Sequence, residues 1–302
     1  MYLVDHVVAD IRALKIQGAT NIALTILETL EKLIIEIPDM PAKSLFDIGT
    51  TLAYARPTEP LSQNAIRYIF SDFDTSVARK IEEYRTYIEK SKKEIPVIGK
   101  QLLVDGGVYL TLCHSGTTVA LFKEARSSGA YFSVYVAETR PRFQGRVTAT
   151  ELLDFGFDDV TMIVDDVAIA LLEGRRGKID AVFIGADLLT DTGFVNKIGS
   201  LALTAAAHRN HIPVYSLTTL LKYDPRPFDL SFIETRSAEE IWKDAPQKLQ
   251  FYAPAFDYVP YFPNVHVVCE AGIIKGKQVQ SAVNKRYPFI ATGKGTQNGE
   301  SL

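Results

Sequence analysis

The feature that most constrains the fold is an alternation of short apolar runs with helical patterns after residue 100. The runs are rich in Val, Ile, Phe and Tyr, and they are VYLTLC, YFSVYVAE, DVTMIVDD, IDAVFIGAD, IPVYSLT and VHVVCEAG. Segments in which apolar residues recur at three and four, such as TTVALFKEARSSG and VAIALLEG, lie between several of them. This alternation predicts an α/β domain with a mostly parallel sheet and helices on both faces.

The first part of the chain, residues 3–93, shows a helical pattern instead. Apolar residues recur at three and four in VDHVVADIRALKI and in IALTILETLEKLII, and Gly18 is the expected break between these two helices. The basic stretch EKSKKEIPVIGK is interpreted as a solvated helix end rather than a binding patch, and it marks a boundary near residues 94–100. We therefore expect a helical N-terminal domain over residues 1–97 and the α/β domain over residues 98–302.

Composition narrows the class of protein. Of 302 residues, 47% are hydrophobic and 23% charged, so the chain can bury a full core. The net charge of -3, without a long basic block, argues against nucleic acid as the main partner. No apolar run reaches the roughly 18 residues of a membrane span, and the start of the chain lacks a secretory signal. Two cysteines are too few for a disulfide framework, so a reducing cytoplasm is expected. The polar end GKGTQNGESL is expected to be disordered.

Ligands of open α/β sheets bind outside the carboxyl ends of the strands, and this rule selects candidate residues. The polar residues just past the predicted strands are Cys113, His114, Glu138, Asp165, Asp166, Asp187, Thr218 and Glu270. Aspartates also cap helices and start turns, and capping is the favoured interpretation for Asp165 and Asp166. Cysteine has no capping role, so Cys113 is equally open to a functional interpretation and to that of a small buried apolar residue.

The stretch CHSGTTVALF, where a strand passes into a helix, can also cradle a phosphate. Gly116 allows a close backbone approach, and Thr117 or Thr118 can cap the helix. The N–H groups and dipole of a helix N-terminus favour an anion. The same position is expected to lower the pKa of the Cys113 thiol and to favour the thiolate.

Two further loops carry candidate ligands. In GADLLTDTGFVNKIGS, Asp187 ends a strand, and Asn196 and Lys197 are expected to begin a helix. A lysine there is poorly placed against the helix dipole, which favours a phosphate contact over an ordinary surface lysine.

In AETRPRFQGRVTATELL, the grouped arginines Arg140, Arg142 and Arg146 suit bidentate capture of phosphate or carboxylate, with salt bridges to neighbouring acids as the alternative. Thr148 and Glu151 are expected to form a capping box that starts the next helix.

The segments CHSGTTVA, AETRPRFQGRVTATEL, IGADLLTDTGFVNKIGSLALTAAA and APAFDYVP resemble a known family. It comprises the regulatory subunits of translation initiation factor 2B and two related enzymes, 5-methylthioribose-1-phosphate isomerase and ribose-1,5-bisphosphate isomerase. The resemblance covers roughly residues 5–275. It implies a helical N-terminal domain, a Rossmann-like C-terminal domain, and assembly into homodimers or larger homo-oligomers.

The resemblance also implies which residues act. Cys113 and Asp187 match the two residues that carry the reaction in the isomerases, and the signalling subunits generally lack this pair. The CHS triplet and ARPTEPLSQNAIRY favour ribose-1,5-bisphosphate isomerase, with Arg56 matching a contact to substrate phosphate. The isomerases carry Arg-Gly-Ala where this chain has Gln17, Gly18 and Ala19. Glutamine keeps a hydrogen-bond donor but loses the charge.

The implied reaction is conversion of an aldose 1-phosphate to its ketose, with ribose 1,5-bisphosphate giving ribulose 1,5-bisphosphate. Asp187 would open the ring and move protons at the oxygens, and Cys113 would move the C2 proton. No metal or other cofactor is needed. His114 follows Cys113 directly and is not expected to pair with it. The expected substrate-binding residues are Gln17, Gly18, Ala19, Arg56, Ser115, Arg140, Gln144, Arg146, Asn196 and Lys197.

Two alternatives remain open. One is a methylthioribose-1-phosphate isomerase, which Gln17 favours and the CHS and RPTEPLSQNAIR stretches do not. The other is a non-catalytic regulatory protein that partners a translation factor. Loss of Cys113 or Asp187 would have favoured the regulatory protein, and the chain has both.

Overall fold

The computed structural model describes residues 2–72, 76–174 and 177–291, which divide into two compact units. The helical unit contains the described residues of 1–91, 220–227 and 280–302. The sheet unit contains those of 92–219 and 228–279. The domain boundary expected between residues 97 and 98 stays a prediction, and the GKGTQNGESL segment lies outside the described residues.

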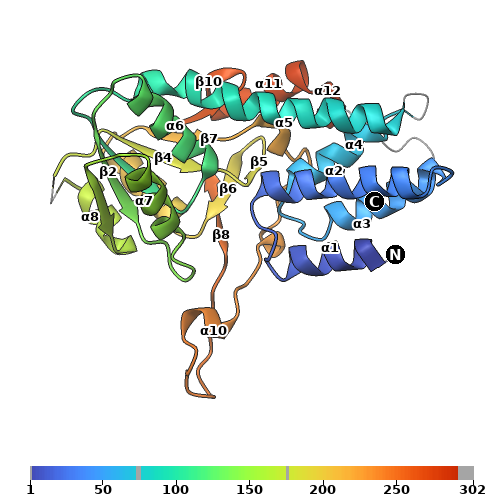
Figure 1. Ribbon diagram of the computed structural model, residues 1–302. Coiled ribbons are helices and arrows are strands. Elements are labelled where there is room, and N and C mark those ends of the chain that lie inside the picture. The colour runs from blue at the N-terminus through green and yellow to red at the C-terminus, as the bar shows by residue number, and fades with distance from the viewer. Residues whose placement is uncertain (1, 73–75, 175–176, 292–302) are drawn as a thin grey trace. The chain divides into compact units, whose positions relative to one another are not determined.

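Helices form the N-terminal part of the chain, as predicted (Figure 1). Gly18 caps the second helix with a φ of 81°, a left-handed conformation that costs glycine little because it lacks a Cβ. The predicted break therefore falls between the first two helices. The helices are α1 (Tyr2–Arg12), α2 (Ala19–Glu36), α3 (Ala42–Ala53), α4 (Pro60–Ile69) and α5 (Val77–Gly99), of which α5 continues into the sheet unit.

A segment distant in sequence completes the helical unit. The turn η2 (Leu220–Lys222) is held by Asn64 of α4, whose side-chain amide donates to the carbonyls of Leu221 at 2.7 Å and Tyr223 at 2.8 Å. The helices α11 (Val279–Arg286) and α12 (Pro288–Ala291) follow the last strand of the described residues. The hydrogen bonds of Asn64 to Leu221 and Tyr223 join residues more than 150 positions apart, so no local sequence pattern could predict them.

Within the described residues, seven strands form the main sheet, in the order β10-β9-β7-β4-β1-β2-β3. All neighbours pair in parallel except β10, which runs antiparallel to β9. This confirms the predicted α/β class with a mostly parallel sheet. The strands are β1 (Val108–Leu112), β2 (Ser133–Ala137), β3 (Val160–Ile163), β4 (Ala181–Gly185), β7 (Val214–Leu217), β9 (Val265–Cys269) and β10 (Gly272–Lys275).

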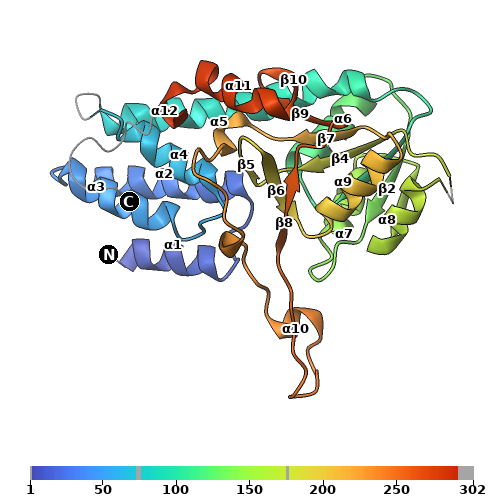
Figure 2. The same cartoon turned by 180° about the vertical axis from the view of Figure 1, so that it is seen from behind.

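Helices cover both faces of this sheet (Figures 1 and 2). Right-handed crossovers put α6 (Gly116–Ser127) and α7 (Gln144–Asp154) on one face, and α8 (Asp165–Leu172) and α9 (Ser200–Arg209) on the other. Alternate strand residues point to opposite faces. One set packs with α6 and α7 and includes Tyr109, Val134, Val136 and Phe183. The intervening residues, including Leu110, Val182 and Ile184, are also buried, as expected for strands covered on both faces.

A small antiparallel sheet, which the sequence pattern did not predict, consists of β5 (Leu188–Leu189), β6 (Gly193–Lys197) and β8 (Phe256–Pro260). The chain turns back after β5 because the Thr190 hydroxyl accepts the amide of Gly193 at 3.0 Å and donates to its carbonyl. The expectation that Asn196 and Lys197 begin a helix was wrong, since both lie on β6 and α9 begins at Ser200. The helix-dipole argument for Lys197 therefore does not apply.

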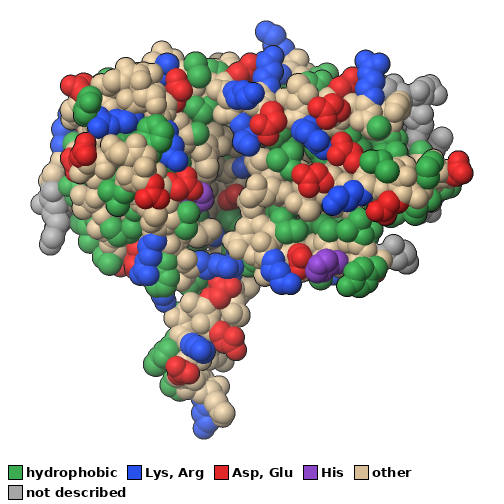
Figure 3. Space-filling model, viewed as in Figure 1, with side chains coloured by type: hydrophobic (Ala, Val, Ile, Leu, Met, Phe, Trp, Pro, Cys, Tyr) green, Lys and Arg blue, Asp and Glu red, His purple; other side chains and the backbone are tan. Residues whose placement is uncertain are grey.

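Residues 228–255 form an extended arm of the sheet unit that contains η3 (Leu230–Phe232) and α10 (Ala238–Ile241) (Figure 1). Its base is closed by backbone hydrogen bonds from Arg236 to Ala253 and from Ala255 to Glu234, both 2.7 Å. Along the arm, Trp242 and Tyr252 are exposed. On the face in Figure 3, acidic and basic side chains are interspersed over the surface.

Among the described residues, each helix is too short or too polar to span a membrane. In the same residues, no group of three or more His, Cys, Asp or Glu side chains could hold a metal ion.

Candidate functional site

The site lies where the strand order of the main sheet reverses. From β1 the chain moves outward through β2 and β3, and then returns to place β4 on the other side of β1. The crevice at such a switch point, outside the carboxyl ends of the strands, is the usual ligand position in open α/β sheets. Cys113 follows β1 directly, and Asp187 follows β4 by two residues. The fold thus brings these two predicted residues to the ends of neighbouring strands.

Cys113 adopts a left-handed backbone conformation, with a φ of 70°. Its amide donates to the hydroxyl of Thr139 at 2.8 Å, and its carbonyl accepts the hydroxyl proton of Thr148 at 2.9 Å. The buried Sγ donates to Gln144 Oε1 at 3.5 Å. Gln144, a predicted ligand, is the first residue of α7, so the start of this helix faces the thiol.

The thiol is protonated near neutral pH. Burial raises the pKa of Cys113 to about 11; the Lys197 ammonium lowers it, and the Asp187 carboxylate raises it again. The expected depression of this pKa was wrong, because loss of hydration outweighs the favourable charges around the thiolate. The charges of Lys197 and Asp187 therefore act on the pKa of the thiol in opposite directions.

Lys197 and Asn196 reach the site from β6. The amide of Asp187 donates to the carbonyl of Val195 at 2.8 Å, which holds the β6 strand beside the end of β4. Lys197 is buried, with its Nζ 4.7 Å from the centre of the Phe256 ring. Asn196 is also buried and donates to Ser200 Oγ at 2.8 Å. The small sheet therefore carries a buried cation and a buried amide.

Ser115 connects this cluster with the N-terminus of α6. Its hydroxyl caps the helix by accepting the amide of Thr118 at 3.3 Å, so Ser115 takes the capping role that was expected of Thr117 or Thr118. A Cβ added to Gly185, the last residue of β4, would lie 2.9 Å from Ser115 Oγ and 3.7 Å from Asn196 Oδ1. Ser115 and Asn196 therefore converge above the end of β4.

The capping box expected at Thr148 and Glu151 was wrong. Helix α7 begins at Gln144, four residues earlier, after Phe143 in a left-handed conformation. Thr148 is an interior residue of the helix, and its hydroxyl bonds to Cys113 instead of capping. The early start is possible because Gly145 lies against the carbonyl of Ala137, where a Cβ would clash.

The arginines after β2 are occupied by neighbouring groups. Arg140 donates to the carbonyl of Ile241 in the arm at 2.9 Å, and Arg146 pairs with Glu138 at 3.5 Å. Both guanidinium groups lie over the Phe143 ring, at 4.8 and 3.8 Å from its centre. Arg140 also lines a hollow of about 240 Å³ with Asp165 and Asp166. Their predicted role in binding phosphate stays a prediction.

Asp165 does not cap its own helix, contrary to the favoured interpretation. Its two carboxylate oxygens accept the amides of Thr139 at 2.7 Å and Arg140 at 2.8 Å. This carboxylate therefore fixes the loop after β2, which in turn supplies the Thr139 hydroxyl to Cys113.

His114 does not pair with the thiol through its side chain. Its Nδ1 lies 3.2 Å from Thr148 Oγ1, and its Nε2 lies 3.6 Å from Glu151 Oε1. Burial lowers the pKa of His114, and Glu151 opposes this shift.

The remaining predicted ligands belong to the helical unit. Gln17 is exposed and donates to the carbonyl of Leu14 at 2.5 Å. Gly18 and Ala19 stand at the start of α2. Arg56 is buried and forms an ion pair with the buried Glu59 at 3.2 Å.

One residue of the site was missed by the sequence analysis. Asp257 on β8 pairs in register with Asn196 on β6, and its carboxylate accepts the amides of Gly199 at 2.8 Å and Leu201 at 3.0 Å. Burial raises its pKa. It caps α9 from another strand. The capping role of Asp257 could not be predicted, because Asp257 and the start of α9 are more than 50 residues apart in the chain. The only sequence signal for Asp257 was its place in the segment APAFDYVP.

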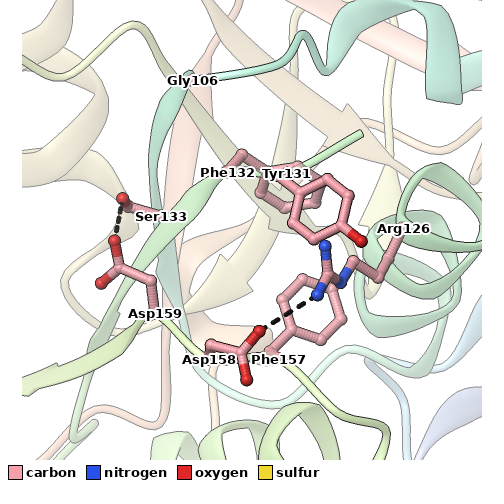
Figure 4. A pocket seen from close by; sticks show the side chains of 8 residues that line it. All are labelled: Gly106, Arg126, Tyr131, Phe132, Ser133, Phe157, Asp158 and Asp159. Carbon is pink, nitrogen blue, oxygen red and sulfur yellow. Dashed lines mark hydrogen bonds and ion pairs between the residues drawn. The ribbon is translucent and has the colours of Figure 1, made fainter. Parts of the chain in front are cut away.

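A second hollow of about 250 Å³ lies at the amino ends of β1, β2 and β3 (Figure 4). Arg126 spans it, with its guanidinium 3.6 Å from the centre of the Tyr131 ring and 3.2 Å from Asp158. Because the arginine is already paired and the hollow is at the opposite edge from Cys113, it does not belong to the candidate site.

The pKa of Cys113 leads to a prediction. In a Cys269→Ser background, Cys113 is the single thiol, and its alkylation by iodoacetamide should rise about tenfold per pH unit from pH 7 to 10, because only the thiolate reacts. Asp187→Asn removes a charge that raises this pKa, so alkylation at pH 8 should become faster. Asp191→Asn, in the β5–β6 turn, should leave the rate unchanged. An alkylation midpoint at or below the ordinary thiol pKa would contradict this account.

The chain is similar to several known proteins. Residues 15–276 match the model of the Initiation factor 2 subunit family. The ribose 1,5-bisphosphate isomerase of Methanocaldococcus jannaschii is 29% identical, over 96% of this chain and 97% of that protein. The methylthioribose-1-phosphate isomerase of Thermoanaerobacter sp. is 34% identical, over 67% of this chain and 63% of that protein. The structure of the Pyrococcus horikoshii translation initiation factor eIF-2B is similar, with a TM-score of 0.76 and 23% identity over 90% of this chain and 96% of that one. The chain therefore belongs to the initiation factor 2 subunit family.

Proposed function

We propose that this protein is an aldose–ketose isomerase that converts ribose 1,5-bisphosphate to ribulose 1,5-bisphosphate. One observation carries the proposal: Cys113 and Asp187 follow neighbouring strands at the switch point of the sheet, and the carboxylate charge acts on the buried thiol. A base and an acid that share one small site are what the reaction requires. The relatives named as sugar-phosphate isomerases support the same reaction class.

The proposed mechanism moves the thiol proton of Cys113 to Asp187 before the reaction. Because the Asp187 carboxylate raises the pKa of the Cys113 thiol, moving the thiol proton to Asp187 removes this effect and leaves a thiolate beside the Lys197 ammonium, which lowers the same pKa. The exchange yields a base at Cys113 and an acid at Asp187. Each positioned group of this kind contributes typically about 10² to 10⁴-fold to a rate.

The proton transfers then balance. A 1-phosphate keeps the sugar ring closed, so Asp187 protonates the ring oxygen as its bond to C1 breaks, and the Cys113 thiolate takes the proton from C2. The product of these steps is an enediol phosphate. Cys113 returns its proton to C1, and Asp187 takes the proton from the C2 hydroxyl. The ketose forms, and the pair is again a thiolate and a carboxylic acid.

The groups around the pair suit an anionic substrate. The N-terminus of α6, capped by Ser115, offers the positive end of a helix dipole. Thr118 Oγ1 near this end is buried and has no hydrogen-bond partner among the described residues. Lys197 adds a buried positive charge, and Gln144 and Asn196 add amides for hydroxyl groups. We assign the 1-phosphate to α6 and Lys197.

The second phosphate distinguishes the two candidate substrates. By the family resemblance, Arg56 matches a contact to substrate phosphate, and we assign it to the second phosphate. The buried position of this arginine suits a fixed charge. Gln17 favours the alternative substrate, methylthioribose 1-phosphate, because that sugar has a neutral thioether in place of the second phosphate and Gln17 carries no charge. A non-catalytic regulatory role is disfavoured by the presence of both Cys113 and Asp187.

We also infer that the chain forms homodimers or larger homo-oligomers. The exposed Trp242 and Tyr252 of the arm support association. Light scattering of the full chain should give a mass of at least twice the 33.5 kDa of the monomer. A monomer mass at micromolar concentration would refute this inference.

The reaction itself is tested by supplying both sugar phosphates and measuring the ketose. The wild-type protein should isomerise ribose 1,5-bisphosphate faster than methylthioribose 1-phosphate. Cys113→Ser should reduce turnover at least about a hundredfold, the scale of a lost acid/base group, without loss of folding. Cys269→Ser, which changes the other buried thiol, should retain activity. Equal activity of Cys113→Ser and the wild type would remove Cys113 from the mechanism.

Binding measurements test the second phosphate, with Cys113→Ser as the parent so that ligand is not consumed. Arg56→Ala should weaken binding of ribose 1,5-bisphosphate about ten- to a hundredfold, as expected for one charge-assisted contact, and should hardly change binding of ribose 1-phosphate. Gln17→Arg should tighten only the bisphosphate. Asn21→Arg, one turn further along α2, adds the same charge as a control. Equal weakening of both ligands by Arg56→Ala would show that Arg56 does not bind the second phosphate.

A further inference from the structure

The conformation of Cys113 needs support from its surroundings. A non-glycine residue with a φ of 70° is strained, and such conformations persist only where other contacts fix them. Cys113 lies just beyond the paired residues of β1, so strand pairing does not fix it. Its two backbone groups are instead bonded to hydroxyls of two threonines from other elements.

The hydrogen-bond roles in this arrangement are determined by the number of protons. The Thr139 hydroxyl donates its one proton to the carbonyl of Ala137 at 3.0 Å, so it accepts the Cys113 amide. The Thr148 hydroxyl donates its one proton to the Cys113 carbonyl, so it accepts from Nδ1 of His114 at 3.2 Å. Thr139 therefore accepts the amide proton of Cys113, and Thr148 donates a proton to its carbonyl.

Both threonines are rigidly placed. Thr139 and Thr148 are each 1% exposed. The Thr139 amide is bonded to Asp165, and Thr148 lies in the middle of α7. The same helix supplies Gln144, which accepts the thiol proton. Helix α7 thus contacts Cys113 at both its carbonyl and its sulfur.

We propose that Thr148 and Thr139 are positioning residues that clamp Cys113 in its left-handed conformation and so hold the thiol in the buried site. Neither threonine touches the reacting atoms. The conformational role stands on the hydrogen bonds alone, whereas its catalytic consequence rests on the proposed isomerase function. Without the clamp, the residue relaxes toward an extended backbone and the thiol leaves its buried position.

The test uses thiol reactivity, which does not depend on the identity of the substrate. In the Cys269→Ser background, Thr148→Val keeps the side-chain shape and removes the hydroxyl. Because burial raises the thiol pKa, release of the thiol should increase its alkylation by iodoacetamide at pH 8 about tenfold, the effect of one pKa unit. Thr148→Ser, which keeps the hydroxyl, should restore the parent rate to within about twofold.

The matched control is Thr150→Val on the same helix. The Thr150 hydroxyl bonds to the carbonyl of Arg146 within α7 and has no contact with Cys113, so its loss should leave the alkylation rate unchanged. If Thr148→Val does not fold, as judged by its thermal melt, Thr139→Val tests the same clamp from the loop after β2. An alkylation profile of either folded valine variant that coincides with that of Thr150→Val would overturn the proposal.

Turnover separates the clamp from the proposed function. If both are correct, Thr148→Val lowers kcat about tenfold or more with little change in KM, and Thr148→Ser recovers it. If the parent protein isomerises neither sugar phosphate, the proposed function fails, but the order of alkylation rates still decides whether the clamp exists. Unchanged kcat in a variant with altered alkylation would refute the catalytic consequence alone.

Discussion

The parallel pairing of β1 with β2 on one side and β4 on the other is the constraint on which the site depends. Tyr109 pairs with both Val134 and Ala181, which fixes the register of the three strands. Their carboxyl ends therefore lie at the same edge of the sheet. Because the strand order reverses at β1, the crevice at this edge is the usual ligand position in open α/β sheets. Cys113 and Asp187 are functional candidates because their strands end at this crevice.

Burial gives the crevice its chemistry. A thiol in water would be a weak base with an ordinary pKa, whereas the buried thiol of Cys113 has a pKa of about 11 and becomes a stronger base once its proton is removed. Lys197 and Asp187 act on this pKa in opposite directions, so the state of the thiol depends on the charge of its neighbours. Of these two charges, Lys197 is buried and Asp187 is half-buried.

Local pattern predicted the main sheet well and its surroundings poorly. The strands β1, β2, β3, β4, β7 and β9 all fall within predicted runs, because buried parallel strands have a composition that loops and helices do not share. The short β6 strand was taken for the start of α9, because NKIGSLALTAAA continues the apolar spacing of the helix back through Lys197. The start of α7 was missed because no side chain caps its first turn. The sequence signal at this position is Gly145, which lies against the carbonyl of Ala137 in β2.

The sequence by itself determined the α/β class, the helical N-terminal region and the residues at the strand ends, because these follow from periodicity and from the order of elements along the chain. It also identified Cys113 and Asp187 as candidates. Only the tertiary structure decided that the thiol is protonated, that Lys197 reaches it from a strand, and that Thr139 and Thr148 hold its backbone. The physical reason is that pKa values and hydrogen bonds depend on which groups meet across the fold, and these groups come from segments separated by many residues.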